Sequence, residues 1–169
     1  MILVLLQDGF EEIEALTPVD MLRRAGADVR TVGMCGPVAV GTHGISVVAD
    51  MTADAIPADG VDMVILPGGM PGASGLDASP TVDALIARVY KNGGHLAAIC
   101  AAPMVLGHRG YLKGKRATCF PGFEEHLTGA EVCDLPFVTD GRITTGKSVY
   151  TAMAFSEELV RIVREGGGV

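Results

Sequence analysis

Residues 95–110 read HLAAICAAPMVLGHRG, and this stretch decides the fold. Residues 95–100 form a short apolar run of the kind that makes a strand buried on both faces. A short helix is expected directly after it, so Cys100 would occupy a nucleophile elbow at the edge of a sheet. Backbone amides and the helix dipole favour a thiolate there, and we expect Cys100 to be a reactive cysteine with a lowered pKa. The alternative is a buried structural thiol.

The rest of the chain continues this alternation of strand and helix. Pro18 disfavours a helix interior, so the first helix is expected to begin near Thr17–Pro18 or to kink there, which leaves Glu14 in the turn after the first strand. The pattern predicts a three-layer α/β/α sandwich around a mostly parallel sheet, in one domain spanning residues 1–169. The expected strands are 2–6, 27–33, 45–50, 63–66 and 116–119; the expected helices are 80–91 and 148 onward, with a helical turn and loop at 123–132 and a frayed end at 164–169.

Composition and charge argue against several classes of protein. The 169 residues are 49% hydrophobic and 20% charged, which is typical of a globular protein. A net charge of −7 argues against a nucleic-acid-binding or anionic-membrane-binding surface. No signal peptide is evident, and the longest apolar run, 96–107, is too short to span a bilayer. We therefore expect a cytoplasmic protein with reduced cysteines and no metal site or cofactor.

Residues 141–148, GRITTGKS, match the G-x-x-x-x-G-K-[ST] pattern of phosphate-binding loops. A phosphate-binding loop has its strand before the first glycine, whereas here Asp140-Gly141 is a hairpin signal and a β-branched run follows it. We therefore expect a hairpin turn, a strand and Ser148 as the N-cap of the last helix, and no nucleotide site.

The site should lie where the parallel strands end, after Leu6, Leu66 and Ile99. Glu14 could be held protonated beside the thiol and move a proton, or it could be a first-turn acid that interacts with the helix dipole. The tight turn at Gly68-Gly69 could aim backbone amides into the same crevice, and the amides of Gly69 and Ala101 could form an oxyanion hole.

Histidine partners for the thiol are less evident. His95 is expected at the amino end of its strand and His108 to point away, whereas His43 and His126 lie on loops and stay open.

Three motifs resemble the ThiJ/PfpI superfamily (class I glutamine amidotransferase-like), in the branch of the parkinsonism-associated protein deglycase and its bacterial relatives. They are EEIEALTPVDMLRRAG, VILPGGMPGA and LAAICAAP, and the likeness runs from Ile2 to about Val163. The resemblance implies a flavodoxin-like sandwich and a homodimer. It also implies Cys100 as an oxidation-sensitive nucleophile, Glu14 as its protonated partner, and Gly69 and Ala101 as the oxyanion hole.

The activity implied by the resemblance is that of a cofactor-independent glyoxalase or deglycase acting on methylglyoxal, glyoxal or their adducts, with a stress-protection role. The alternatives are a redox-sensing or chaperone-like stress protein and an amidase- or hydratase-type hydrolase. Some members carry a histidine where this chain has Phe120, and protease-like members have one where it has Ala101, which argues against peptidase activity. His43 falls about where relatives have an arginine that reaches the partner subunit's pocket. Further candidates for the pocket are Gly68, Cys119, Phe120 and Gly146.

Overall fold

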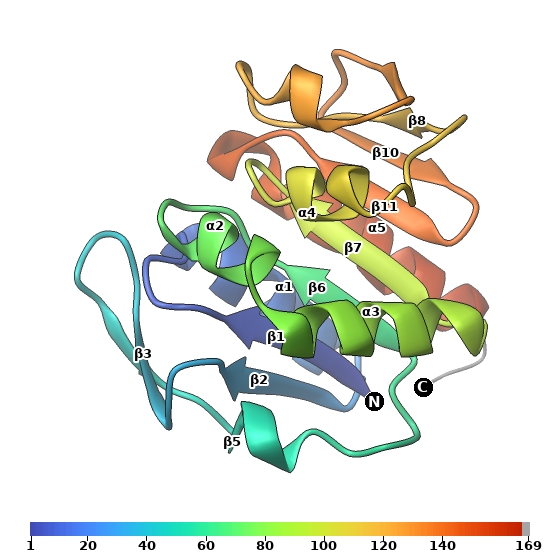
Figure 1. The fold of residues 1–169 in the computed structure, drawn as a ribbon. Helices are drawn as coiled ribbons and strands as arrows, with labels where there is room; N and C mark the ends of the chain where they lie inside the picture. Colours follow the sequence, from blue (N-terminus) through green and yellow to red (C-terminus); the bar gives the residue numbers. More distant parts are fainter. Residues whose placement is uncertain (167–169) are drawn as a thin grey trace.

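The computed structural model describes residues 1–166, which form a seven-stranded sheet between two layers of helices (Figure 1). Every neighbouring pair of strands is parallel except the antiparallel pair β10 and β11. The mostly parallel three-layer sandwich predicted from the sequence is confirmed. The strands, in order across the sheet, are β10 (Phe137–Asp140), β11 (Ile143–Gly146), β7 (His95–Ile99), β6 (Met63–Leu66), β1 (Ile2–Leu6), β2 (Val29–Gly33) and β5 (Met51–Thr52).

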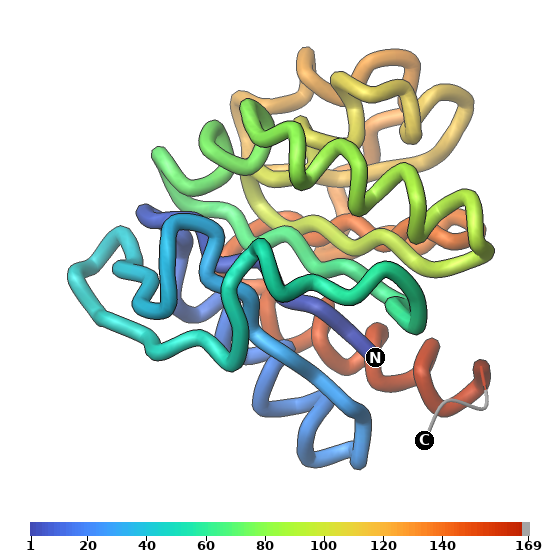
Figure 2. Tube along the Cα trace, turned by 60° about the horizontal axis from the view of Figure 1, so that its bottom comes forward, coloured from blue at the N-terminus to red at the C-terminus, as the bar shows by residue number. Residues whose placement is uncertain are grey.

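The central strands are apolar throughout because both of their faces are covered (Figure 1). In β1, Leu3 and Leu5 belong to one hydrophobic core, whereas Ile2, Val4 and Leu6 belong to the other. The helices that cover the first core are α2 (Gly72–Asp77), α3 (Pro80–Lys91) and α4 (Pro103–His108). The helices that cover the second are α1 (Glu12–Arg24) and α5 (Ala152–Glu165), which lie side by side (Figure 2).

Helix α1 differs from the prediction because it begins at Glu12 and runs through Pro18. The Glu11 side chain caps it by accepting a hydrogen bond from the Glu14 amide, at 2.8 Å. Proline removes one backbone hydrogen bond, and burial of the face that includes Val19 and Leu22 outweighs that loss. Glu14 therefore lies in the first helical turn and not in the turn before the helix.

Residues 45–50 were predicted as a strand, which the structure confirms, although this strand is not part of the main sheet. β4 (Ser46–Val48) instead pairs with β3 (Val38–Val40) in a separate antiparallel hairpin. The sequence alone did not separate a half-exposed hairpin strand from a buried one, and the Val48 side chain is 77% exposed. One edge of the main sheet is formed by β5 and the other by β10.

The segment between α4 and β10 forms a small unit of its own, with a two-stranded sheet and a helical turn, beside one end of the main sheet (Figure 1). β8 (Arg116–Ala117) was predicted as a strand and pairs in parallel with β9 (Glu131–Val132), which was predicted as loop. The expected helical turn is η2 (Glu124–His126). Two further short helical turns are η1 (Ala53–Ala55) and η3 (Val149–Thr151).

The GRITTGKS segment forms the predicted hairpin, with Gly141 in the left-handed region at φ +62° and β11 after it. Ser148 occupies the N-cap position of η3, and its amide donates to Thr151 Oγ1 at 3.1 Å. A β-carbon on Gly146 would lie 2.8 Å from the Phe155 ring, so close packing requires this glycine. The expected frayed end falls partly on residues 167–169, which lie outside the described residues. None of the helices within residues 1–166 has the length and apolar character needed to cross a membrane.

Candidate active site

Cys100 sits in a strained turn between β7 and α4. Its φ of +65° makes it the one non-glycine residue with positive φ among residues 1–166. Its amide donates to the Gly146 carbonyl at 2.9 Å, and its carbonyl accepts from the Phe120 amide at 2.8 Å. Such a conformation persists only where the surroundings hold it, and strain of this kind concentrates at functional sites. The predicted elbow geometry is present.

The first turn of α1 carries Glu14 to the carboxyl ends of β6 and β7. Its side chain is buried, and Oε2 accepts a hydrogen bond from the Gly68 amide at 3.0 Å. A β-carbon on Gly68 would lie 2.5 Å from that oxygen and 2.7 Å from Cys100 Cβ. Glutamate, glycine and cysteine are thus packed so tightly that only glycine fits between the two side chains. Oε1 of Glu14 has no hydrogen-bond partner among the described residues.

The acid and the thiol perturb each other. Burial raises the pKa of Glu14 to about 7; the interaction with Cys100 and the Gly68 amide oppose this rise, and the charge of Glu11 adds to it. Burial also raises the pKa of the Cys100 thiol above its ordinary range, and ionised Glu14 raises it further. The predicted lowering of the thiol pKa is therefore wrong, because desolvation and the charge of Glu14 together outweigh the effect of the backbone amides.

Two backbone amides favour the thiolate. Hydrogen bonding from Ala101 and Gly69 lowers the pKa of Cys100, against the effect of burial. Gly69 has φ +86°, and a β-carbon there would overlap the Glu11 amide. The turn after β6 therefore needs glycine to bring its N–H to the sulfur. These are the two donors that the sequence indicated for an oxyanion hole.

Glu11 is a residue of the site that the sequence reasoning did not single out. Its amide donates to the Gly68 carbonyl at 2.9 Å, and its carboxylate accepts from the Glu14 amide. The Gly68 amide in turn donates to Glu14, which closes a ring of three hydrogen bonds. The signal that could have found it is an acid three residues before Glu14, at a helix N-cap.

His43 forms hydrogen bonds with Glu12 and not with Cys100. Its amide and its Nδ1 are 2.7 and 2.8 Å from the two Glu12 oxygens, and its side chain is 69% exposed. Glu12 is buried and fills the space beside Gly41. Glu11, Glu12 and His43 bring possible metal-ligand atoms within 4.8 Å of one another. Because the Glu12 carboxylate is already bound by His43, we assign the cluster the role of anchoring the loop before β4 to α1.

The remaining candidates have other roles. Burial raises the pKa of Cys119 to about 11, with a contribution from Glu124, so this thiol is protonated at neutral pH. The Phe120 side chain is 41% exposed, and its backbone amide donates a hydrogen bond to the Cys100 carbonyl. His95 is buried at the amino end of β7 and bonds Thr144, as its position predicted. Within residues 1–166 no histidine forms a hydrogen bond with Cys100 or Glu14.

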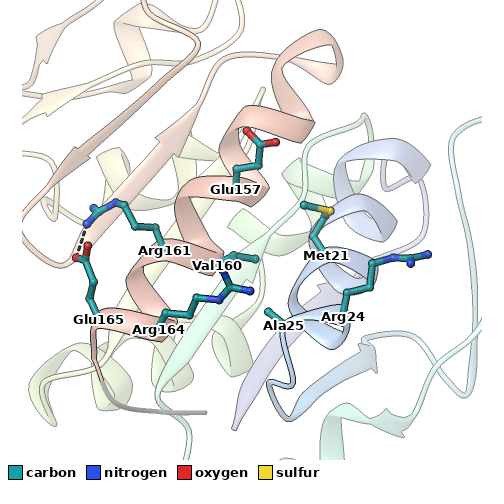
Figure 3. Close-up of a pocket in the computed structure, with 8 residues that line it drawn as sticks. All are labelled: Met21, Arg24, Ala25, Glu157, Val160, Arg161, Arg164 and Glu165. Atoms are coloured by element: carbon teal, nitrogen blue, oxygen red, sulfur yellow. Dashed lines mark hydrogen bonds and ion pairs between the residues drawn. The ribbon is translucent and has the colours of Figure 1, made fainter.

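A surface hollow of about 540 Å³ lies between α1 and α5 (Figure 3). Arg24 and Arg164 lie beside an apolar floor that includes Val160, and Arg161 pairs with Glu165 (Figure 3). A second hollow lies at the amino ends of the strands, around Met1, His95 and Arg142. Neither hollow is lined by Cys100 or Glu14, so the site is assigned from the chemistry of the elbow. The residues lining the first are Met21, Arg24, Ala25, Glu157, Val160, Arg161, Arg164 and Glu165.

Comparison with known proteins extends over almost the whole chain. Residues 1–162 match the model of the DJ-1/PfpI family. Protein DJ-1 homolog B of Arabidopsis thaliana is 37% identical over 162 residues, which are 94% of this chain but only 37% of that protein's length. A deglycase of Pyrococcus abyssi is 27% identical over 165 residues, 96% of this chain and 99% of its own. The crystal structure of a cysteine-to-alanine mutant of a DJ-1 superfamily protein from Salmonella typhimurium has 36% identity and a TM-score of 0.91, and the match covers 98% of this chain and 90% of that one.

Proposed function

The chain belongs to the DJ-1/PfpI family, and from this premise we propose that it is a cysteine-dependent glyoxalase or deglycase. Its substrates would be methylglyoxal, glyoxal or the adducts they form, and the biological role would be protection from stress. The deglycase from Pyrococcus abyssi supports the general class of activity. The observation that carries the proposal is the buried Glu14 carboxyl, with a pKa raised to about 7, packed against the strained Cys100.

The proposed reaction begins with addition of the Cys100 thiolate to the aldehyde carbon. A C–S bond forms, and the carbonyl oxygen takes the electron pair and a proton, giving a hemithioacetal. The amides of Gly69 and Ala101, which lower the pKa of the Cys100 thiol, would stabilise the negative charge that develops at this point. Protonated Glu14 is the proton donor, through an oxygen that has no other partner among the described residues.

The second half of the reaction is an internal redox step. Ionised Glu14 removes the hydrogen from the former aldehyde carbon as a proton and returns a proton to the neighbouring carbon. The first carbon becomes a thioester while the neighbouring ketone becomes an alcohol, so no external oxidant is needed. Water then cleaves the thioester, which releases lactate from methylglyoxal or glycolate from glyoxal and restores the thiol.

Lactate formation from methylglyoxal tests this proposal directly. We expect Cys100→Ala and Glu14→Gln each to lose at least about a hundredfold in rate, the scale of a lost nucleophile or general acid–base group. Cys119→Ala is the matched control, since that buried thiol is protonated, and it should retain the wild-type rate. Equal rates for the wild type and Cys100→Ala would exclude the mechanism.

A redox sensor is the second candidate. Cys100 is partly exposed, and the free oxygen of Glu14 is a hydrogen-bond partner for an oxidised sulfur. Treatment with mild peroxide, which supplies the two oxygens, would yield a sulfinate at Cys100 as a stable gain of two oxygens in intact mass. Unmodified protein with continued aldehyde turnover would contradict this candidate.

A homodimer and a cytoplasmic location belong to the same proposal. Large apolar side chains are exposed on α1, on the β3–β4 hairpin and at η3, with Ile13 52% and Tyr150 94% exposed. Surface of this kind is typical of protein interfaces. Light scattering coupled to size-exclusion chromatography would give twice the chain mass, and a monomer at micromolar concentration would contradict the dimer. No cofactor or metal is required by the proposed chemistry.

A further inference from the structure

Two histidines meet at the surface, away from the thiol site. His108 is the last residue of α4, and His126 is the last residue of η2. Nε2 of His108 lies 3.0 Å from Nδ1 of His126, and the two rings cross at 73° with centroids 5.1 Å apart. The side chains are 37% and 35% exposed, so solvent reaches both rings.

The tautomer of His108 is set by Asp77, the last residue of α2. Its Oδ2 lies 2.9 Å from His108 Nδ1, and a carboxylate accepts the hydrogen bond at such a contact. Nδ1 therefore carries the proton, and Nε2 presents a lone pair to His126. A carboxylate bound to the far nitrogen of a histidine fixes the tautomer and the orientation of the ring, an arrangement that recurs in metal sites.

The support for this pair is rigid. Arg109 donates to Asp77 Oδ1 at 2.6 Å and to the Val105 carbonyl at 2.9 Å, which fixes the carboxylate from its other side. Gly107 lies against the His126 backbone so closely that a β-carbon would overlap the His126 carbonyl. The close approach of α4 and η2 brings the two histidines together without an intervening side chain.

We propose that His108 and His126 form a binding site for a borderline divalent transition metal such as Zn²⁺, with Asp77 orienting His108. Imidazole nitrogen is a preferred ligand for this group of metals, at about 2.0–2.1 Å. Two nitrogens 3.0 Å apart at that bond length subtend roughly a right angle at the ion, so the His126 ring has to move slightly away from His108 to reach the tetrahedral angle that Zn²⁺ prefers.

Binding changes the proton arrangement without net release of a proton. In the metal-free pair, His126 Nδ1–H donates to His108 Nε2. An ion takes both facing lone pairs, so the His126 proton moves to its Nε2, which faces Glu125 at 3.9 Å. Because Asp77 holds the His108 ring, the ion lies along the Nε2 lone pair of His108, and the exposed His126 ring must turn to meet it. Water completes the coordination, and the acidic neighbours Asp77 and Glu125 favour a cation.

Long-range ¹H–¹⁵N NMR of the reduced, full-length protein during titration with zinc chloride tests the site at atomic level. We expect the signals of His108 Nε2 and His126 Nδ1 to shift together and saturate at one ion per chain, with His126 changing tautomer. Ring nitrogens of this pair that stay unchanged at saturating zinc would overturn the proposal, including the case in which zinc binds only to thiols.

Calorimetry with variants supplies an independent measurement. His126→Gln should weaken zinc binding at least tenfold, and Asp77→Asn by about 10- to 100-fold. His43→Gln is the matched control, because His43 is also an exposed histidine bound to a carboxylate. This variant should bind zinc with the affinity of the wild type. Equal affinity in wild type and His126→Gln would refute the site. If that variant fails to fold, the NMR titration of the wild type still decides.

Discussion

Replacing Glu14 by glutamine should stabilise the protein at neutral and alkaline pH while it disables the thiol site. Glutamine has nearly the same shape as glutamate, and its carbonyl oxygen can keep the hydrogen bond from the Gly68 amide. It cannot ionise, so the variant avoids the burial of a negative charge. Stability and activity are therefore expected to change in opposite directions.

The size of the effect follows from the raised pKa of Glu14. An increase from the ordinary 4.5 to about 7 corresponds to about 3 kcal/mol against the ionised form in the folded state. The unfolded chain releases this proton near pH 4.5, so the folded state binds the extra proton between pH 4.5 and 7. The stability linked to this group is fully present below pH 4.5 and is lost as the pH rises through 7.

Urea unfolding followed by circular dichroism, between pH 5 and 8.5, measures this difference. The advantage of Glu14→Gln over the wild type should grow by about 2.5 kcal/mol across this range, with most of the change below pH 7.5. The same pair in a Cys100→Ala background should show at least as large a change, because the thiol lowers the pKa of Glu14. A difference that does not vary with pH would refute a buried acid with a raised pKa.

Three further changes test the surroundings. His95 is buried with a pKa lowered to about 4, so the wild type should lose up to about 3 kcal/mol of stability relative to His95→Gln as the pH falls from 6.5 to 4; a difference in unfolding free energy that does not vary with pH would contradict this. Gly68→Ala should reduce lactate formation by at least about tenfold without loss of the circular dichroism spectrum, because its methyl group would displace Glu14 or Cys100; a wild-type rate would disprove the steric argument. Glu11→Gln should lower the pKa of Glu14 and shift the pH midpoint of lactate formation downward, whereas an unmoved midpoint would show that the charge of Glu11 is unimportant.

The central part of the site could be predicted because it depends on chain order. Cys100 follows a buried strand and Gly68 and Gly69 follow another, and parallel strands bring their carboxyl ends to one edge. The roles of the three acids at the start of α1 could not be separated in the same way. Pro18 suggested a later start of the helix, and the direction in which each acid points depends on where the helix begins.

Close contacts between the backbone of a glycine and a distant segment could not be predicted from sequence patterns. Gly41 lies so close to Glu12, and Gly107 to His126, that neither has room for a β-carbon, and this depends on how closely two segments distant in the chain approach each other. An apolar run likewise does not specify its partner, so the strand predicted at 45–50 could not be assigned to one sheet or another from the sequence. Hairpin chemistry is local, and for that reason the turn at Asp140-Gly141 was predicted correctly.

The raised pKa of the Cys100 thiol leads to a specific pH dependence. Ionised Glu14 opposes the thiolate, whereas protonated Glu14 does not and can donate to sulfur, so the pair favours a single negative charge. Thiolate formation increases with pH while the fraction of protonated Glu14 falls above about pH 7. Alkylation of Cys100 by iodoacetamide in the wild type should therefore rise with pH over two coupled ionisations. In Glu14→Gln it should follow one ionisation with a lower midpoint, because the opposing charge is gone, and identical profiles for the two proteins would show that the carboxyl and the thiol titrate independently.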